Sequence, residues 1–249
     1  MEWSEPAIVL ECVRFGESDA RVSVLTETLG TWHGLARGGA SRRQVATWQP
    51  GNLLAARWVA RLPEQLGTLS GELIHPAAAL AMGDALALTI LRAACAVAAG
   101  ALPEREPHQN LFIALARLLA GITDTAHALP ALVRFERDLL ADLGYGLDLR
   151  TCAVTGSSEN LTFVSPRTGR AVSAEAVGLW RARVLPLPAF LGHDHDDPPP
   201  DWSAIRDGLA LTGHFLARAA FAAHHAPLPW ARVALYDQLA RLAENPNDA

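Results

Sequence analysis

Ten residues, GLARGGASRR (34–43), combine three glycines with three arginines in a chain whose formal net charge is -5. Guanidinium groups donate charge-assisted hydrogen bonds to phosphate oxygens. Glycine lets a backbone turn sharply or approach a ligand closely. A glycine-rich basic loop is therefore an expected footprint of phosphate binding, although surface loops are often polar without any such role. Glycines 34, 38 and 39 fit either a close ligand contact or a plain turn.

The sequence around this loop carries charge of one sign. No Asp or Glu occurs from Thr28 to Pro63, whereas five arginines do. Guanidinium groups that neutralise phosphates, interleaved with rings that stack on bases, are typical of proteins that bind single-stranded nucleic acid. The residues expected to contact phosphates are Arg37, Arg42 and Arg43, helped by Arg57 or Arg61.

Three tryptophans lie in the same acid-free window. Trp58 alternates with Arg57, so a strand would turn it inward, and we expect it in the core. Trp32 and Trp48 are candidates for base stacking, and a structural role in the core is the equal alternative for both.

The first 76 residues read as short strands separated by turn-rich segments such as FGESD and ETLG. Alternation supports this reading, since Val22 and Val24 alternate with Arg21 and Ser23. Five strands of this length predict a small barrel of the OB type. The expected strands are 7–13, 21–26, 31–37, 53–60 and 66–74.

Beyond His75 the apolar residues recur with helical spacing. The fold class predicted is α+β: an OB-type barrel over 1–76, then a mainly helical domain over 77–249. A less regular insert at about 147–183 interrupts the helices, and NLTFVSPRTGRAVS (160–173) within it is expected to form a hairpin. The expected helices are 77–99, 109–120, 129–143, 203–223 and 230–242.

Composition points to a cytoplasmic protein. The chain has 249 residues, 50% of them hydrophobic, which is enough for one or two domains with a real core. Its N-terminus lacks the long apolar segment of a signal peptide. The apolar run 77–102 is interrupted by Asp84 and Arg92, so no membrane span is expected. Three scattered cysteines do not suggest a disulfide framework.

Other chemistry has weaker support. GHDHDD places His193 and His195 beside three aspartates, a combination that can bind a metal, but the PPP that follows favours a solvated linker. His224 and His225 are expected to end a helix, where a cation interacts favourably with the dipole. No GxGxxG, Walker loop, HExxH or GxSxG occurs. We therefore expect a binding protein rather than an enzyme, without a cofactor or metal.

Several segments together resemble the RecO family of bacterial recombination mediators. They are AIVLECVRFGESDARVSVLTETLGTWHGLARGGASRR, LVRFERDLLADLGYGLDL, FVSPRTGRAVS and LPWARVALYDQL. The resemblance implies DNA repair and recombination at the nucleoid, with binding of single-stranded and also double-stranded DNA and annealing of complementary strands. It implies action with RecR to load RecA onto strands coated by single-strand-binding protein. The alternatives left open are a protein-interaction scaffold with little DNA binding and an unrecognised enzyme.

The insert departs from the pattern of this family. Many members carry two Cys-x-x-Cys pairs there, and a structural zinc site needs four ligands. Here the corresponding segments read CAVT (152–155) and SAEA (173–176), which leaves Cys152 alone. We expect a degenerate zinc-finger-like insert that folds without metal. Its packing is expected from Phe163, Val164, Val172 and Trp180.

The resemblance also implies that the acidic tail of single-strand-binding protein docks on the helical domain. An acidic peptide that ends in a carboxylate calls for an arginine beside an apolar pocket. Arg134 in LVRFERDLL is the first candidate and Arg137 the second. The alternative is that Arg134 pairs with Asp138 at i+4 spacing.

Overall fold

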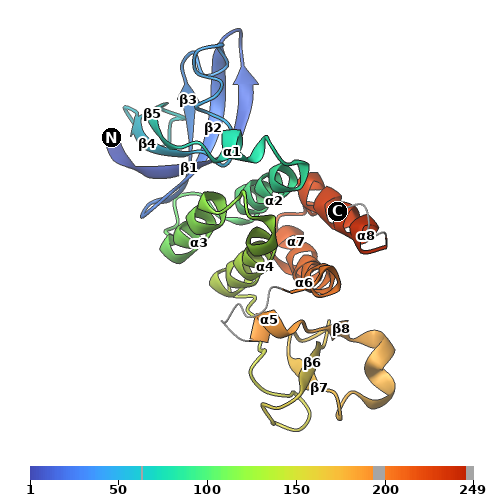
Figure 1. The fold of residues 1–249 in the computed structure, drawn as a ribbon. Helices are drawn as coiled ribbons and strands as arrows, with labels where there is room; N and C mark the ends of the chain where they lie inside the picture. The colour runs from blue at the N-terminus through green and yellow to red at the C-terminus, as the bar shows by residue number, and fades with distance from the viewer. Residues whose placement is uncertain (63, 193–199, 245–249) are drawn as a thin grey trace. The chain divides into compact units, whose positions relative to one another are not determined.

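The computed structural model describes residues 1–62, 64–192 and 200–244. The chain divides into two compact units, Met1–Ala128 and Leu129–Ala249 (Figure 1). The boundary expected from the sequence, 76/77, lies earlier, where the last barrel strand ends. The His and Asp side chains of 193–197, considered above as metal ligands, lie outside the described residues.

The first unit contains a closed five-stranded barrel with the strand order β1-β2-β3-β5-β4 (Figure 1). Neighbouring strands are antiparallel except for β3 and β5. This is the OB-type barrel that the sequence predicts, and each expected strand is present with shifted ends. The strands are β1 (Glu2–Phe15), β2 (Asp19–Thr26), β3 (Gly30–Ala36), β4 (Leu53–Val59) and β5 (Thr68–His75).

Alternation along the strands fills the barrel interior. In β4, Leu54, Ala56 and Trp58 are buried, whereas the residues between them are exposed. In β2, Val22 and Val24 are fully buried. Because side chains of a strand point alternately to its two faces, one set from each strand meets inside the barrel. The other set lies on the outer surface and includes buried residues such as Leu25 and Ser23 as well as exposed ones.

Three helices follow the barrel within the same unit: α1 (Ala77–Ala81), α2 (Ala85–Ala101) and α3 (Gln109–Ala120). The sequence predicts one helix over 77–99, and the structure breaks it before Ala85. The Asp84 carboxylate accepts hydrogen bonds from the N–H groups of Leu86 (2.7 Å) and Ala87 (3.2 Å), so it caps α2 and starts a new helix. α2 packs against β1.

The second unit is mainly helical. α4 (Thr125–Asp142) crosses the division between the units and begins four residues earlier than expected, after Asp124 accepts a hydrogen bond from the N–H of His127. α6 (Trp202–Phe215) continues through the π-helical turn η2 (Leu216–Ala220) into α7 (Phe221–Ala223). His224 caps the end of α7, as expected. The last helix, α8 (Trp230–Glu244), packs against α6.

The insert holds a three-stranded sheet of order β7-β6-β8. The expected hairpin is confirmed, with β6 antiparallel to β7. Val164 and Val172 are buried as expected, but Trp180 is 61% exposed, so the prediction that it helps to pack the insert is wrong. The elements are β6 (Leu161–Val164), β7 (Ala171–Ser173), η1 (Gly178–Arg183), β8 (Leu185–Pro186) and α5 (Ala189–Gly192).

Candidate nucleic-acid interface

The basic loop, residues 37–52 between β3 and β4, is a series of hydrogen-bonded turns. The N–H of Gly38 donates to the Asp19 carboxylate (2.7 Å), and the N–H of Ala40 donates to the Ser18 carbonyl (2.8 Å). These two bonds fix the start of the loop to the turn between β1 and β2. At its end, the Asn52 side-chain amide donates to two loop carbonyls. The backbone that carries the loop arginines is thus preorganised, which reduces the ordering entropy that binding would otherwise lose.

Two of the loop-region glycines have roles in the fold. Gly38 has φ +66°, a left-handed conformation that glycine adopts without strain. A Cβ at Gly34 would lie 2.7 Å from the Cβ of Leu69 on β5, so only glycine permits this close approach inside the barrel. Turn geometry and packing therefore account for both residues.

The arginines of the acid-free window differ in how they are paired. Arg37, Arg42, Arg43 and Arg61 are exposed, and within the described residues their guanidinium groups make no ion pair or hydrogen bond. Arg57 instead pairs with Glu2 through two contacts of 3.0 Å. A bidentate pair of this kind compensates the guanidinium charge. Arg57 and Arg61 are the two residues expected to assist the loop arginines. Of these, Arg61 is therefore the one whose guanidinium has no partner among the described residues.

The tryptophans of the window are all in the core. Trp58 is fully buried, as expected, and its indole N–H donates to the carbonyls of His33 and Leu66. Trp48 is 1% exposed and Trp32 is 5% exposed. The Trp32 ring contacts those of Trp3 and Trp58, and the guanidinium of Arg105 lies 4.6 Å from its centroid. The stacking hypothesis for Trp32 and Trp48 is therefore corrected, because neither offers an open face to a base.

Two cations near the loop were missed from the sequence because they precede the acid-free window. Arg21 on β2 is exposed and pairs in register with Leu35 on β3, two residues before Arg37. Arg14, near the end of β1, donates to the carbonyl of Glu17 in the β1–β2 turn (2.6 Å). The alternation of Arg21 with Val22 was the signal for an outward-facing cation, and only the strand register shows that it shares a face with Leu35.

The two arginines expected to bind an acidic tail contact the segment around α5. The Nε of Arg134 donates to the carbonyl of Phe190 (3.4 Å), and Nη1 of Arg137 donates to that of Leu191 (3.1 Å). Asp138, considered as the partner of Arg134, is bound by Arg137 at 2.8 Å. Arg137 also lines a cavity of about 280 Å³, whose other lining residues include Arg150 and three leucines at 147, 149 and 191. This cavity combines two arginines and the acidic Asp138 with apolar side chains.

In the insert, Cys152 contacts two of the other three positions discussed for zinc, Thr155 and Ser173. The buried Cys152 accepts a hydrogen bond at Sγ from the N–H of Ser173 (3.3 Å). Burial raises the pKa of this thiol, but hydrogen bonds from the side chain and backbone of Thr155 and from the N–H groups of Ser173 and Val154 lower it to about 6. Among the described residues, no three His, Cys, Asp or Glu side chains are grouped to hold a metal.

The exposed Trp180 lies at an apolar cleft of the insert. The cleft has a volume of about 410 Å³, and its walls include Val154 and Val177 together with Arg167 and Arg183. The guanidinium of Arg183 lies 5.4 Å from the centroid of Trp180. Its walls contain no acidic residue.

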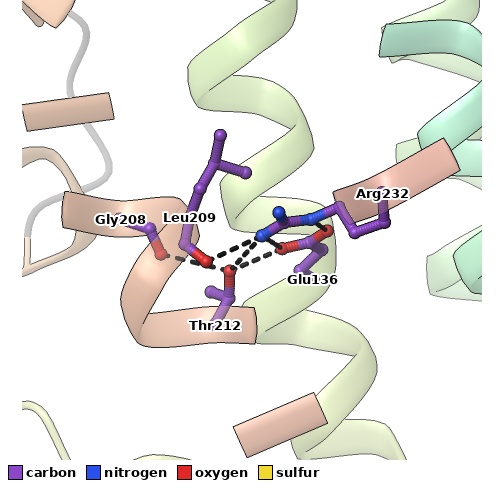
Figure 2. Close-up of polar contacts among 5 residues, drawn as sticks. All are labelled: Glu136, Gly208, Leu209, Thr212 and Arg232. Atoms are coloured by element: carbon purple, nitrogen blue, oxygen red, sulfur yellow. Dashed lines mark hydrogen bonds and ion pairs between the residues drawn. The ribbon is translucent and has the colours of Figure 1, made fainter. Parts of the chain in front are cut away.

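The centre of the helical unit contains a buried ion pair (Figure 2). Arg232 on α8 is 1% exposed and Glu136 on α4 is fully buried, and Nη2 of the arginine lies 2.9 Å from Oε2 of the glutamate. The same Nη2 donates to the carbonyl of Leu209 (2.8 Å), while the Thr212 hydroxyl donates to Glu136. The segments LVRFERDLL and LPWARVALYDQL, singled out above as separate motifs, therefore meet here.

The fold and the candidate site define an α+β protein with an N-terminal OB barrel, a preorganised basic loop and a helical second unit. No helix in the described part of the chain is long and apolar enough to cross a membrane. Two family models match: "Recombination protein O N terminal" over residues 1–77 and "Recombination protein O C terminal" over residues 82–226. The chain belongs to the RecO family of DNA repair proteins.

Individual relatives are similar in sequence to this chain along nearly its whole length. A protein named DNA repair protein RecO from Acidiphilium cryptum is 67% identical over 250 residues, covering 100% of both chains. Proteins of the same name from Gluconacetobacter diazotrophicus (55% over 257 residues, 100% of both chains) and Granulibacter bethesdensis (53% over 247 residues, 98% of both) are also similar. The family membership supports a role in DNA repair.

Proposed function

We propose that this protein binds single-stranded DNA through the basic loop of its barrel and so acts as a recombination mediator. The observation that carries the proposal is a set of four exposed guanidinium groups, at Arg37, Arg42, Arg43 and Arg61, that have no ion pair or hydrogen bond among the described residues and belong to an OB-type barrel and its loops. Barrels of this type bind oligonucleotides on the face of strands 2 and 3 and on the loops between strands 1 and 2 and between strands 4 and 5. The basic loop begins where β3 ends, and Arg61 lies in the connection between β4 and β5. The protein acts by binding, without a catalytic site, a cofactor or a metal.

The proposed cellular role follows from the family. The protein anneals complementary strands and, with RecR, helps to load RecA onto DNA coated by single-strand-binding protein, in the cytoplasm at the nucleoid. Double-stranded DNA is a further ligand, because contacts to phosphates alone carry no requirement for unpaired bases.

The acidic tail of single-strand-binding protein is proposed to dock beside Arg137 rather than Arg134. A carboxylate next to apolar side chains requires a cation beside an apolar wall, and the cavity lined by Arg137, Arg150, Leu147 and Leu149 offers both. Asp138 also lines this cavity and pairs with Arg137, so Arg150 is the cation proposed to meet the carboxylate of the tail. Arg134 lies 5.6 Å from the Phe190 ring centroid and donates to the carbonyl of that residue, contacts that support a structural role.

The deciding experiment is fluorescence anisotropy with a labelled oligothymidylate across a salt series. If the four free arginines each neutralise one phosphate, log affinity falls with log salt at a slope near -3, using roughly -0.7 per phosphate for single strands. The double reversal Arg42→Glu with Arg43→Glu is expected to reduce this slope by at least about 1.4. It should leave the melting temperature nearly unchanged, because both side chains are exposed.

Arg57 and Arg61 supply a matched control with the same substitution. Arg61→Gln removes an uncompensated charge and is expected to reduce the slope by about 0.7. Arg57→Gln removes a guanidinium already paired with Glu2, so its slope should stay close to that of the wild type. A folded double-reversal variant with wild-type affinity and slope would exclude the basic loop as the DNA site. Failure of the wild type to bind at low salt would favour a protein-interaction scaffold.

A further inference from the structure

An exposed aromatic side chain lies at the turn of the β1–β2 hairpin. Phe15 is the last residue of β1, and its side chain is 55% exposed. Every other Phe, Trp or Tyr of the first unit is buried, counting the described residues 1–62 and 64–128. Within this described part of the unit, Phe15 is therefore the one Phe, Trp or Tyr ring that a ligand can reach.

Strand register places Phe15 on the same outer face as the exposed cations. Val13 pairs with Arg21, and Arg21 pairs with Leu35, so these three side chains share one face of β1, β2 and β3. Phe15 lies two residues after Val13 and belongs to that face. Arg37 lies two residues after Leu35, at the start of the basic loop. The ring of Phe15 is thus part of a surface that also carries two guanidinium groups.

Two acids belong to this face, Glu11 and Asp19. Glu11 is exposed and lies two residues before Val13, at the end of the face farther from Phe15. Asp19 pairs with Phe15 in register, and its carboxylate accepts the N–H of Gly38, which holds it against the loop backbone. Val13 is 44% exposed and extends the apolar area beside the ring. An exposed aromatic ring at the end of β1, on the face that carries Arg21 on the neighbouring β2, has the composition of a base-stacking platform.

We propose that Phe15 stacks on an unpaired base and that this contact makes the barrel prefer single-stranded over double-stranded DNA. Arginine contacts to phosphates do not distinguish the two forms by themselves, because both present phosphates. A ring can cover a base face only where the neighbouring base does not, and in a duplex each base is stacked on both sides. The inference rests on the proposed function and adds the residue that sets the preference for single strands.

The test compares Phe15→Ala with wild type on a labelled 20-nucleotide oligothymidylate and on a labelled 20-base-pair duplex. Loss of one stacked base is expected to weaken single-strand affinity by about 5- to 150-fold. Duplex affinity should stay within about twofold of that of the wild type. The salt slope should not change, because no cation is removed, and this separates the effect from that of the arginine variants.

Two further variants make the test specific. Ile74→Ala removes an apolar side chain of similar exposure, 53%, from β5 of the same barrel, and should leave both affinities unchanged. Phe15→Trp keeps an aromatic face and should restore single-strand affinity. Thermal melts establish that each variant is folded, which an exposed position favours.

The outcomes separate the two proposals. Unchanged single-strand affinity of Phe15→Ala, in a protein whose salt slope still responds to loop reversal, would overturn the stacking role and leave the DNA site in place. Equal loss on single strand and duplex would overturn the preference. Failure of the wild type to bind either probe would instead overturn the proposed function itself.

Discussion

Replacing Arg232 with Met should strongly destabilise the helical unit. The substitution keeps an unbranched side chain of similar length but removes the guanidinium that contacts Glu136, Leu209 and Thr212 (Figure 2). Glu136, with no exposed surface, is then left with the Thr212 hydroxyl as its remaining side-chain partner. A buried carboxylate without a counter-charge is far more costly than a broken surface pair, because water cannot replace the lost partner.

The expected loss is about 3–5 kcal/mol, as is typical when one partner of a buried ion pair is removed. For a chain of this size, 1 kcal/mol corresponds to about 2–4 °C in Tm, so the Tm should fall by about 6–20 °C. Calorimetry or circular dichroism at pH 7 measures the shift. The double variant Glu136→Met with Arg232→Met should recover most of the loss, since no charge remains and Thr212 can donate to the carbonyl of Gly208 at 3.1 Å.

The comparison with a surface pair gives this prediction a control. Arg57→Gln breaks an exposed pair with Glu2 and should change the stability by less than about 1 kcal/mol. A Tm of Arg232→Met within about 2 °C of the wild type would refute the reasoning. So would a double variant less stable than the single one, because the unpaired charge would then not be the cause.

Two more predictions concern the insert. The pKa of the Cys152 thiol is lowered to about 6 in the folded state, so the protein takes up a proton when it unfolds between about pH 6 and pH 9. The free energy of unfolding should therefore rise with pH over this range. The stabilising contribution of the thiolate should be lost as the pH falls through about 6. Urea unfolding at pH 6, 7 and 8 should show this rise in the wild type and a flatter dependence in Cys152→Ser. Because the insert holds one cysteine and no described group of metal ligands, EDTA should leave the Tm unchanged; stoichiometric zinc by elemental analysis would contradict this.

Local patterns predicted the elements of this fold well. Five short strands separated by turn-rich segments, supported by alternation, predicted the barrel, and the helix over 109–120 was predicted with its observed ends. The break before Ala85 was missed because an apolar periodicity continues through it, whereas the break itself depends on the side chain of Asp84. Boundaries set by one capping residue are not visible in the hydrophobic pattern.

The candidate site was less predictable because it depends on which side chains, distant in the sequence, contact one another in the folded protein. The charge run gave the loop arginines, but nothing local shows that Arg57 pairs with Glu2, 55 residues away. The local sequence also does not show that the guanidinium of Arg105 covers the ring of Trp32. Phe15 was overlooked because it precedes the acid-free window, and only the strand register brings it to the face that carries Arg21.

The buried pair also has a consequence for how the protein is made. Arg232 follows Glu136 by 96 residues, which a ribosome adds in about 5–20 s at typical bacterial and eukaryotic speeds. During that interval the nascent helical unit contains a carboxylate whose counter-charge has not yet been synthesised. Closure of α4 on α6 before α8 is made would bury this carboxylate without its counter-charge, so polypeptides released before Arg232 should be cleaved by proteases more readily than the full chain. Synthesis of α8 thus supplies the partner on which the buried Glu136 depends.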